Sequence, residues 1–430
     1  MRVSSLTKLH RYASRKLCSP FNGRCSVSST STKYPDFRAL ALHEGLVNNL
    51  RSTGITSPTQ IQQKAIPKIF QNCDIVIAAE TGSGKTLSYL LPLVQQLRLH
   101  SRTQEQPQSS PDCIILTTSQ DLVRQIKSVL AQVDADFMKD HTAYVSSMSK
   151  ISGGSNCPLK MIFSTPSALL RASKPKDFDF VRHIVVDEAD MLLSGGAEKD
   201  TKLLLATIQN RARHSGNAIQ YIFSAISFYL LKLPFAYYGR RSVRQFMEKK
   251  YPDIDFVETR HFQQLVPQLQ ASLYDLDEFA KPQPATFKDR CALLWDILAN
   301  SSETAEQPRI LIFANTVQSA EALQDFLANK KDYPCSVLHK KVDSFSRRQI
   351  VHQLTQNGNQ NAIIPPDAPK TIICTDIASR GLDTLSVGHV IQFEFARDAI
   401  SYIHRIGRTA RAGHPGKGTR SSMMCLFGSS

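Results

Sequence analysis

The sequence predicts an α/β protein of two tandem domains, each built on a doubly wound parallel sheet. Three observations support this fold class. Short apolar runs alternate with helical patterns over residues 35–257, as in consecutive strand–helix–strand units. The same alternation returns over residues 270–430, and 430 residues suffice for two or three domains. A glycine-rich turn joins one early apolar run to a helix, which is where such sheets bind phosphate groups.

The charge and cysteine content limit the kinds of partner, binding site and compartment that we expect. The chain has 52 Lys and Arg against 37 Asp and Glu, a net charge of +15 that favours a polyanionic partner. Its nine cysteines form no Cys-x-x-Cys pair, which argues against a zinc site and a disulfide framework and predicts a reducing compartment. No apolar run reaches the length of a membrane span, so we expect no membrane partner.

Residues 1–34 have the composition of an organelle transit peptide. The first 35 residues contain no Asp or Glu, seven Arg or Lys and eleven Ser or Thr, and apolar residues recur among them at helical spacing. We therefore expect this segment to direct the chain to the mitochondrial matrix. The alternative is a disordered basic arm that touches nucleic acid.

The elements of the first domain, residues 35–257, follow in order. Apolar residues at 40, 42, 46, 47 and 50 predict a helix that Gly54 ends, and the turn at Pro58 and Thr59 starts a second helix over 62–70. Strands are expected at 75–78, 113–117, 160–164, 183–186 and 219–223. Helices are expected at 121–133 and 199–212, and a surface loop at 100–111.

Residues 226–268 fit neither domain cleanly. Their aromatic residues either pack on the first sheet or stack on bases, and the arginines at 240, 241 and 244 either contact phosphate or face solvent. We assign residues 258–269 as a linker.

The second domain, residues 270–430, repeats the pattern. Strands are expected at 270–274, 309–313, 336–338, 371–374, 389–393 and 419–427, and helices at 288–300, 318–329 and 346–355. It contains no second phosphate loop, so one nucleotide site would be shared by two similar folds.

The glycine-rich turn carries the first chemical signal. Its backbone N–H groups and the start of the next helix would cradle phosphate oxygens, Lys85 would reach the β- and γ-phosphates, and the Thr86 hydroxyl would hold Mg²⁺. Ala79 stands where the general pattern has Gly. The alternative is an ordinary strand-to-helix turn. The turn consists of Ala79, Glu80, Thr81, Gly82, Ser83, Gly84, Lys85 and Thr86.

The acidic run Asp187-Glu188-Ala189-Asp190 follows a predicted buried strand. Two carboxylates at the end of such a strand are costly unless a cation lies beside them. With a nucleotide bound, Asp187 would hold Mg²⁺ through water and Glu188 would orient and deprotonate the attacking water. The alternative is an acidic helix cap, but the run lies downstream of a Gly-Lys-Thr turn.

Over residues 37–418 the chain resembles the DEAD-box ATP-dependent RNA helicases, which have two RecA-like domains. The resemblance implies that Gln62 makes two hydrogen bonds to adenine, that Phe37 stacks near it and that Asp383 touches the ribose. It also makes Ala79 ordinary, because Ala is common there in the family. Arg408 and Arg411 would act as arginine fingers on the γ-phosphate.

The remaining family motifs concern RNA and coupling. The resemblance implies that four residues of the first domain contact the RNA backbone: Gly153, Gly154, Thr165 and Pro166. It implies that Thr375 and Arg380 face RNA or the domain interface. It implies that five others couple hydrolysis to unwinding: Asp190, Ser224, Ala225, His404 and Arg405.

The sequence departs from the family pattern at several positions. Ile226 replaces a Thr of the coupling motif, and Glu394-Phe395-Ala396 replaces Asp-x-Pro. The usual Pro-Thr-Arg-Glu-Leu-Ala is Thr-Ser-Gln-Asp-Leu-Val at residues 118–123, so Gln120 lacks the usual charge, which Arg124 would replace. The terminal helix of the second domain is not found before residue 430, as in a truncated gene model, a splice form or a domain with one uncovered face.

These features predict an ATP- and Mg²⁺-dependent RNA helicase or remodeller, active as a monomer. The leader and residues 251–267 resemble the mitochondrial subgroup that assists large-subunit ribosome assembly, so ribosomal RNA and a pre-ribosomal particle are the expected partners. An ATP-gated RNA-binding scaffold with little unwinding is the alternative. A small-molecule kinase would have no use for Arg408, Arg411 and the second domain.

Overall fold

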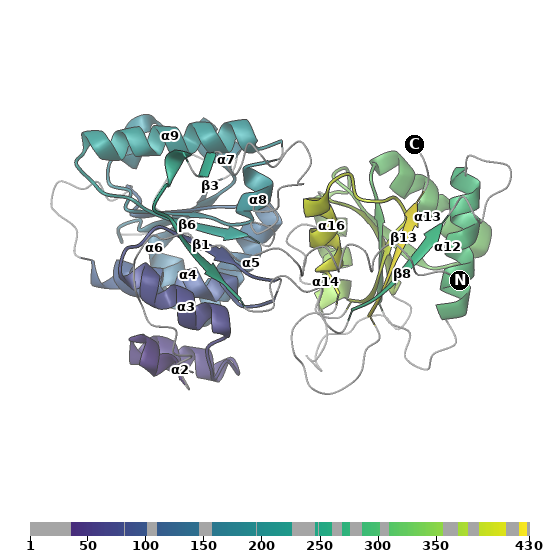
Figure 1. Cartoon of the computed structure of the whole chain (residues 1–430), viewed down its shortest axis with the longest axis horizontal. Helices are drawn as coiled ribbons and strands as arrows, with labels where there is room; N and C mark the ends of the chain where they lie inside the picture. The colour runs from purple at the N-terminus through teal and green to yellow at the C-terminus, as the bar shows by residue number, and fades with distance from the viewer. Residues whose placement is uncertain are drawn as a thin grey trace, which may run out of the picture. The chain divides into compact units, whose positions relative to one another are not determined.

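The structure is a computed structural model, and it contains two separate parallel sheets with helices on both faces of each (Figure 1). This confirms the predicted fold class. The residues it describes are 36–80, 82–100, 110–145, 157–194, 196–225, 246–247, 249–259, 269–275, 286–301, 309–355, 369–376, 387–409 and 421–427. The leader, the basic run at 240–244 and most of the assigned linker lie outside them.

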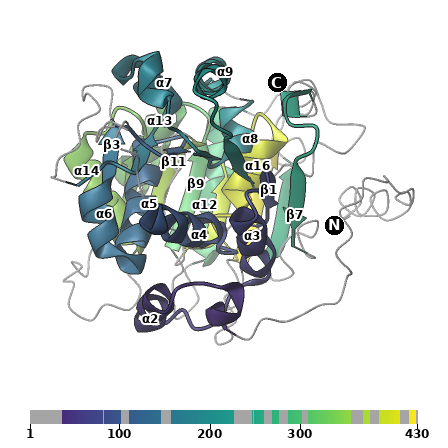
Figure 2. The same ribbon diagram turned by 90° about the vertical axis from the view of Figure 1, so that its left-hand side faces the viewer.

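The first sheet has seven strands in the order β3-β4-β2-β5-β6-β1-β7, all paired in parallel. Figure 2 shows β7 at one edge, beside β1. Strand β1 lies between β6 and β7, and the chain crosses from β1 to β2 in one direction and from β6 to β7 in the opposite direction, as in doubly wound sheets. The strands are β1 (Ile75–Ala78), β2 (Cys113–Leu116), β3 (Thr142–Val145), β4 (Met161–Ser164), β5 (His183–Val186), β6 (Gln220–Ala225) and β7 (Asp255–Glu258).

Alternation along β1 divides the first domain into two cores. Ile75 and Ile77 pack into one hydrophobic cluster, whereas Val76 and Ala78 pack into the other, because successive strand residues face opposite sides. On one side lie α2 (Glu44–Ser52), α3 (Gln60–Phe70), α4 (Lys85–Leu99), α5 (Gln120–Val133) and α6 (Ala135–His141). On the other lie α7 (Pro166–Ala172), α8 (Ala189–Leu192) and α9 (Glu198–His214).

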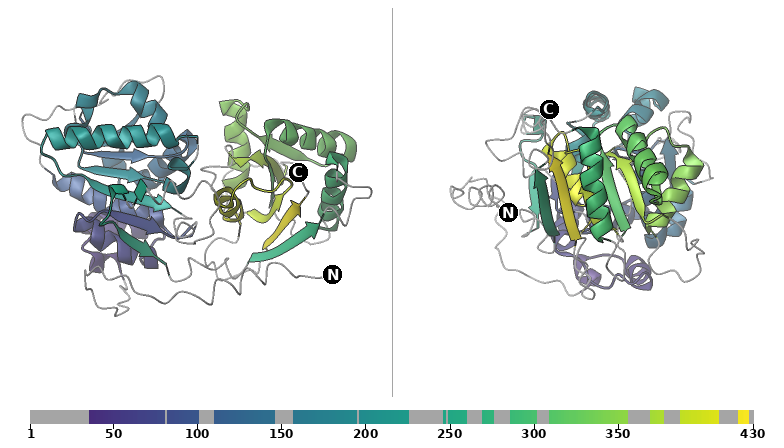
Figure 3. Two further views of the ribbon diagram at one scale, coloured as in Figure 1. Left: turned by 45° about the horizontal axis from the view of Figure 1, so that its top comes forward. Right: turned by 90° about the vertical axis from the view of Figure 1, so that its right-hand side faces the viewer.

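The second sheet has the order β10-β11-β9-β12-β13-β8, again parallel throughout. Figure 3 shows β13 and β8 together at one edge. The strands are β8 (Leu269–Asp275), β9 (Arg309–Ala314), β10 (Cys335–Leu338), β11 (Thr371–Thr375), β12 (Val387–Gln392) and β13 (Ser421–Phe427). Helices α12 (Phe287–Ser301) and α13 (Val317–Lys331) lie on one face, and α14 (Ser344–Thr355) and α16 (Ala399–Ile406) on the other.

The predicted strands and helices are found with ends shifted by a few residues, whereas the helices α6, α7, α8 and α16 were not predicted, and three further details differ. The predicted first helix is a 3₁₀ turn, η1 (Phe37–Leu40), followed by α2, because Ala41 adopts a left-handed backbone with φ 57°. Strand β3 was not predicted, since its residues are half-buried at a sheet edge. Strand β7 was not predicted either, because its four residues include acidic ones at both ends.

No helix in the part of the chain that the structure describes combines the length and apolar character needed to cross a membrane.

Candidate active site

The strand register of the first sheet brings the predicted catalytic motifs together at the carboxyl ends of its strands. Strand β6 lies between β1 and β5, with Phe223 opposite both Val76 and Val186. One residue further on, Ser224 lies opposite Ile77 and level with Asp187. The carboxyl ends of parallel strands meet at the same edge, so the phosphate loop after β1 and the carboxylates after β5 share it.

The phosphate loop depends on glycine at Gly84. Its φ is +90°, in the left-handed region, and Gly82 has φ +78°. A Cβ added to Gly84 would lie 2.4 Å from Nε2 of Gln62 and 3.3 Å from Oγ1 of Thr59. Gly84 is therefore required both for its backbone conformation and for the close approach of α3.

Lys85 begins α4 and its side chain turns back over the loop. Its Nζ donates hydrogen bonds to the carbonyl oxygens of Ala79 and Glu80, both at 2.7 Å. The Ser83 hydroxyl donates to Glu80 O at 2.7 Å. The ammonium group thus lies at the start of α4, where helix N–H groups also favour an anion.

Gln62 ties α3 to this loop. Its Oε1 accepts from Thr59 N at 2.8 Å, completing a capping box, and its Nε2 donates to Gly84 O at 3.2 Å. Adenine recognition by Gln62, which is 1% exposed, would require these contacts to be exchanged. Phe37 is 0% exposed in the core, so stacking on adenine would require η1 to move.

Asp187 is a buried carboxylate held by a buried tyrosine. The Tyr89 hydroxyl, one turn after Thr86 on α4, donates to Asp187 Oδ2 at 2.9 Å. Burial raises the pKa of Asp187 and the Glu188 carboxylate raises it further, whereas the Tyr89 hydrogen bond and the Lys85 ammonium lower it. Burial also raises the pKa of Tyr89 well above its ordinary value, so Tyr89 remains a donor.

Glu188 occupies a constrained position. It has φ 51° and ψ 46°, a left-handed conformation that is uncommon for a residue with a side chain, and it immediately precedes α8. The Thr118 hydroxyl donates to Glu188 Oε2. The backbone thus turns directly after Asp187 and directs the two neighbouring carboxylates to different partners.

Asp190 and His404, both expected in coupling, are brought together. Nε2 of His404 lies 3.4 Å from Oδ2 of Asp190, and both side chains are largely buried. The Oδ1 of Asp190 also accepts from the backbone N of Met191 at 3.1 Å.

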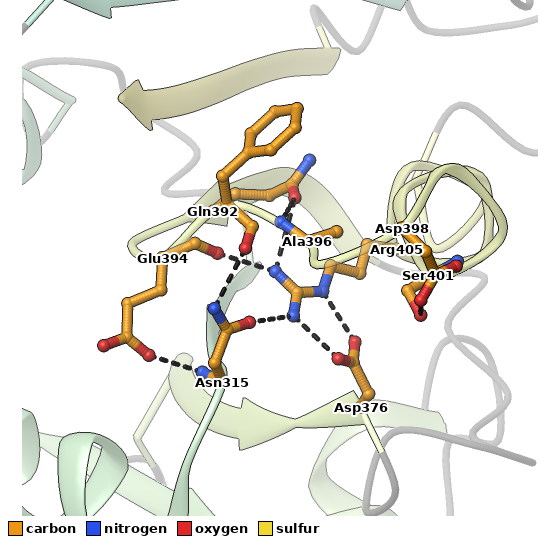
Figure 4. Close-up of polar contacts among 9 residues, drawn as sticks. Asn315, Asp376, Gln392, Glu394, Ala396, Asp398, Ser401 and Arg405 are labelled. Atoms are coloured by element: carbon orange, nitrogen blue, oxygen red, sulfur yellow. Dashed lines mark hydrogen bonds and ion pairs between the residues drawn. The ribbon is translucent and has the colours of Figure 1, made fainter. Parts of the chain in front are cut away.

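Arg405 is the hub of a buried polar network in the second domain (Figure 4). Its Nε and Nη2 bind the two carboxylate oxygens of Asp376 at 2.6 and 2.7 Å. Nη2 also donates to Asn315 Oδ1 at 2.7 Å, and Nη1 donates to Glu394 O at 2.7 Å and Gln392 Oε1 at 3.3 Å. These bonds use all five N–H donors of the guanidinium within the second domain, which leaves no donor for Asp190. His404, rather than Arg405, makes the contact with Asp190.

Glu394, the departure from Asp-x-Pro, serves the same network. Its carboxylate accepts from Asn315 N at 2.6 Å and from the Ser319 hydroxyl at 2.9 Å, at the start of α13. The side chain therefore stabilises the helix N-terminus that adjoins Arg405.

Two family models match the sequence, one in each of the two domains. The DEAD/DEAH box helicase family matches residues 59–225, and the helicase conserved C-terminal domain matches residues 289–413. Together the matches take in more than half of the chain. The chain belongs to the DEAD-box family of ATP-dependent RNA helicases.

Curated DEAD-box relatives match over almost the whole chain. DEAD-box ATP-dependent RNA helicase 39 of Arabidopsis thaliana is 26% identical over 92% of this chain, which spans only 60% of that protein. ATP-dependent RNA helicase HAS1 of Saccharomyces cerevisiae is 28% identical over 96% of this chain and 74% of its own length. For SrmB of Escherichia coli the identity is 27%, over 90% of this chain and 78% of SrmB.

Solved DEAD-box structures share the fold. S. cerevisiae Dbp5 bound to RNA and ADP BeF3 has a TM-score of 0.67 at 21% identity, covering 92% of this chain and 90% of that one. DEAD-box helicase Mss116 bound to ssRNA and UDP-BeF has a TM-score of 0.70 at 22% identity, covering 90% and 73%.

The described part of this DEAD-box chain contains the other expected residues at strand and helix ends. Thr165 and Pro166 begin α7, Thr375 ends β11, and Arg408 is buried just after α16. Ala225 ends β6, and its carbonyl accepts from Ala79 N at 3.3 Å. Seven singled-out residues lie outside the described part: Thr81, Gly153, Gly154, Ile226, Arg380, Asp383 and Arg411.

The described first-domain residues of the DEAD-box site suit a Mg²⁺ ion that is bound together with a nucleotide, rather than a metal ion that is held by protein side chains alone. Among the described residues no group of three or more His, Cys, Asp or Glu could hold a metal ion. Magnesium in nucleotide sites takes one or two protein oxygens and completes its shell with phosphates and water. Asp187, whose burial disfavours its charge, and Thr86 supply such oxygens.

Two residues of this site were missed by the sequence reasoning. Tyr89 lies in an apolar helix, where an aromatic residue indicates packing, and Thr118 lies in a motif that was considered only for its missing charge. The signal for Tyr89 is its spacing of three residues after Thr86, which places both on one helix face.

Proposed function

We propose that this DEAD-box protein is an RNA-dependent ATPase that remodels ribosomal RNA in the mitochondrial matrix, during assembly of the large ribosomal subunit. The observation that carries the ATPase part is the shared strand edge of the first sheet, where Lys85, Asp187 and Glu188 meet. A cation, a metal-holding carboxylate and a base at one edge are the parts that phosphoryl transfer to water requires.

The residues divide the chemistry between them. Lys85 and the N-terminus of α4 bind the phosphates, and Asp187 with Thr86 holds Mg²⁺, which supplies charge neutralisation when bound. Glu188 orients a water molecule whose oxygen attacks the γ-phosphorus. The bond to the ADP oxygen breaks, and Glu188 accepts the proton of the water. Arg408 and Arg411 stabilise the charge that develops on the transferred group.

RNA as the partner is supported by family membership and by charge. Dbp5 and Mss116, which share the fold, are both described with bound RNA. The net charge of +15 suits a phosphate backbone, and backbone contacts confer affinity without sequence information.

The mitochondrial and ribosomal parts of the proposal are supported by the basic, acid-free leader at residues 1–34 and by the subgroup resemblance of residues 251–267. Covalent crosslinking of RNA to a Glu188→Gln chain in cells tests both. We expect enrichment of large-subunit mitochondrial ribosomal RNA. Cytosolic transcripts alone would overturn this location and role.

The ATPase proposal is tested by phosphate release with and without single-stranded RNA. We expect RNA to stimulate the wild-type chain, and Glu188→Gln to lower kcat by about 10²–10⁴, the usual contribution of a general base. RNA-stimulated turnover that survives Glu188→Gln would contradict the proposed role of this residue.

An ATP-gated RNA-binding scaffold is the second candidate, and one contact favours it. Gln120 lacks the usual positive charge, and nearby Arg124 pairs with Asp121 on the same helix. A chain that hydrolyses ATP but releases no strand from a short duplex would favour the scaffold. Ile226→Thr should then increase strand release, and no change would remove Ile226 from this explanation.

A further inference from the structure

The contact between Thr118 and Glu188 follows from strand register. Strands β2 and β5 pair in parallel with Leu116 opposite Val186, and Asp187 N continues the ladder by donating to Leu116 O at 2.9 Å. Two residues beyond that pair, Thr118 and Glu188 lie level with each other. Both are partly buried, and the Thr118 hydroxyl donates to Glu188 Oε2.

The neighbouring hydroxyls have other local partners. Thr117 Oγ1 donates to Ser119 O at 3.0 Å, and Ser119 Oγ accepts from Leu122 N at 3.2 Å and so caps α5. The turn and the helix start are therefore stabilised without Thr118. Its hydroxyl contacts the one side chain in the site that would accept a proton.

This contact is a departure from the family pattern. The usual residue at position 118 is Pro, which has no hydroxyl. A second departure from the pattern, Ile226 in the coupling motif, replaces a Thr and so removes a hydroxyl from the sequence.

We propose that Thr118 is a positioning residue for ATP hydrolysis, because its hydroxyl holds the Glu188 carboxylate in the orientation that accepts the proton of the attacking water. The inference rests on the proposed ATPase function. A general base contributes fully only when it is held in hydrogen-bond reach of its proton. A carboxylate oxygen that accepts one hydrogen bond retains capacity for another, from the water.

The kinetic test compares Thr118→Val, which keeps the shape without the hydroxyl, with Thr118→Ser, which restores it. At saturating RNA we expect Thr118→Val to lower kcat about tenfold with KM for ATP within about twofold of wild type. Thr118→Ser should recover most of kcat. Thr207→Val is the matched control, since the Thr207 hydroxyl only donates to Leu203 O within α9.

A second readout needs no nucleotide. Thr118→Val should lower the melting temperature of the free chain by about 2 °C, and by clearly less in a Glu188→Ala background, where the partner is already absent. Equal shifts in both backgrounds would show that the hydroxyl does not act through Glu188 and would overturn the inference.

The kinetic outcomes separate this inference from the proposed function. If the wild-type chain hydrolyses no ATP, the proposed function fails and the inference fails with it. If the wild-type chain is active and Thr118→Val matches its kcat, only the inference fails. A Thr118→Ser chain as slow as Thr118→Val would also overturn it.

Discussion

At the scale of single residues, the Tyr89 hydroxyl offers the smallest informative change in the site. Tyr89→Phe removes one oxygen that donates to the buried Asp187 carboxylate at 2.9 Å. Since a hydrogen bond to a charged group contributes about 1.5–3 kcal/mol, we expect the free energy of unfolding to fall by that amount. Urea unfolding followed by circular dichroism measures it.

Tyr221→Phe is the matched control for this prediction. The Tyr221 hydroxyl is also buried in the first domain but has no hydrogen-bond partner among the described residues. Its removal should change the free energy of unfolding by less than about 0.5 kcal/mol. If both variants lose the same stability, the Asp187 hydrogen bond is not the cause.

His389 gives a prediction about pH. Its side chain is 6% exposed within β12, and burial lowers its pKa to about 4. The unfolded chain binds a proton near pH 6.5, whereas the folded chain resists it, so stability is lost as the pH falls from 6.5 to about 4. The size of this loss is about 3 kcal/mol.

His389→Leu should remove this loss, because leucine does not titrate. The chain has one tryptophan, and Trp295 lies on α12, so its fluorescence reports on the second domain alone. We expect the unfolding curves of wild type and variant to diverge between pH 7 and pH 4. Parallel curves for wild type and His389→Leu would contradict the prediction.

At the scale of elements, α16 is anchored through Arg405. The guanidinium joins this helix to residues that follow β9, β11 and β12, and it lies 5.1 Å over the Phe313 ring. Arg405→Lys keeps the charge but cannot reproduce the two-point contact with Asp376. We expect a loss of about 3 kcal/mol, since the half-buried Asp376 carboxylate and the other acceptors of the network lose hydrogen bonds.

Denaturant unfolding followed by Trp295 fluorescence measures the effect of Arg405→Lys. The exposed Arg397, just before α16, provides the control Arg397→Lys, which should stay within about 0.5 kcal/mol of wild type. Equal stability of the two variants would show that the network does not hold the second domain together.

At the scale of the whole molecule, charge separates the two interpretations of the leader. Without residues 1–34 the chain keeps a net charge of +8. If the leader only directs the chain to mitochondria, its removal should leave the salt dependence of RNA affinity almost unchanged. The slope of log Kd against log salt then changes by less than about one. Fluorescence anisotropy with a labelled oligouridylate measures this slope, and loss of binding would favour the basic-arm alternative.

Most of the fold was predictable, because the central strands are short, fully buried apolar runs that are too short to form helices. The edge strand β3 was not, since its residues are half-buried and carry a weaker signal. In the site, Lys85, Asp187 and Glu188 could be predicted, because each stands at a fixed position in a motif that directly follows an apolar strand. Tyr89 and Thr118 do not, because their roles arise from register and helix packing between segments far apart in the sequence.

The close approach of Gly84 to Gln62 has an evolutionary consequence. Position 84 has a left-handed backbone with φ +90° and no room for a Cβ while Gln62 keeps its place. A shorter residue at the equivalent of Gln62 would open the space but would not relieve the backbone, so glycine should persist in homologues whatever residue stands at position 62. The start of α3 is therefore free to drift, whereas the phosphate loop is not.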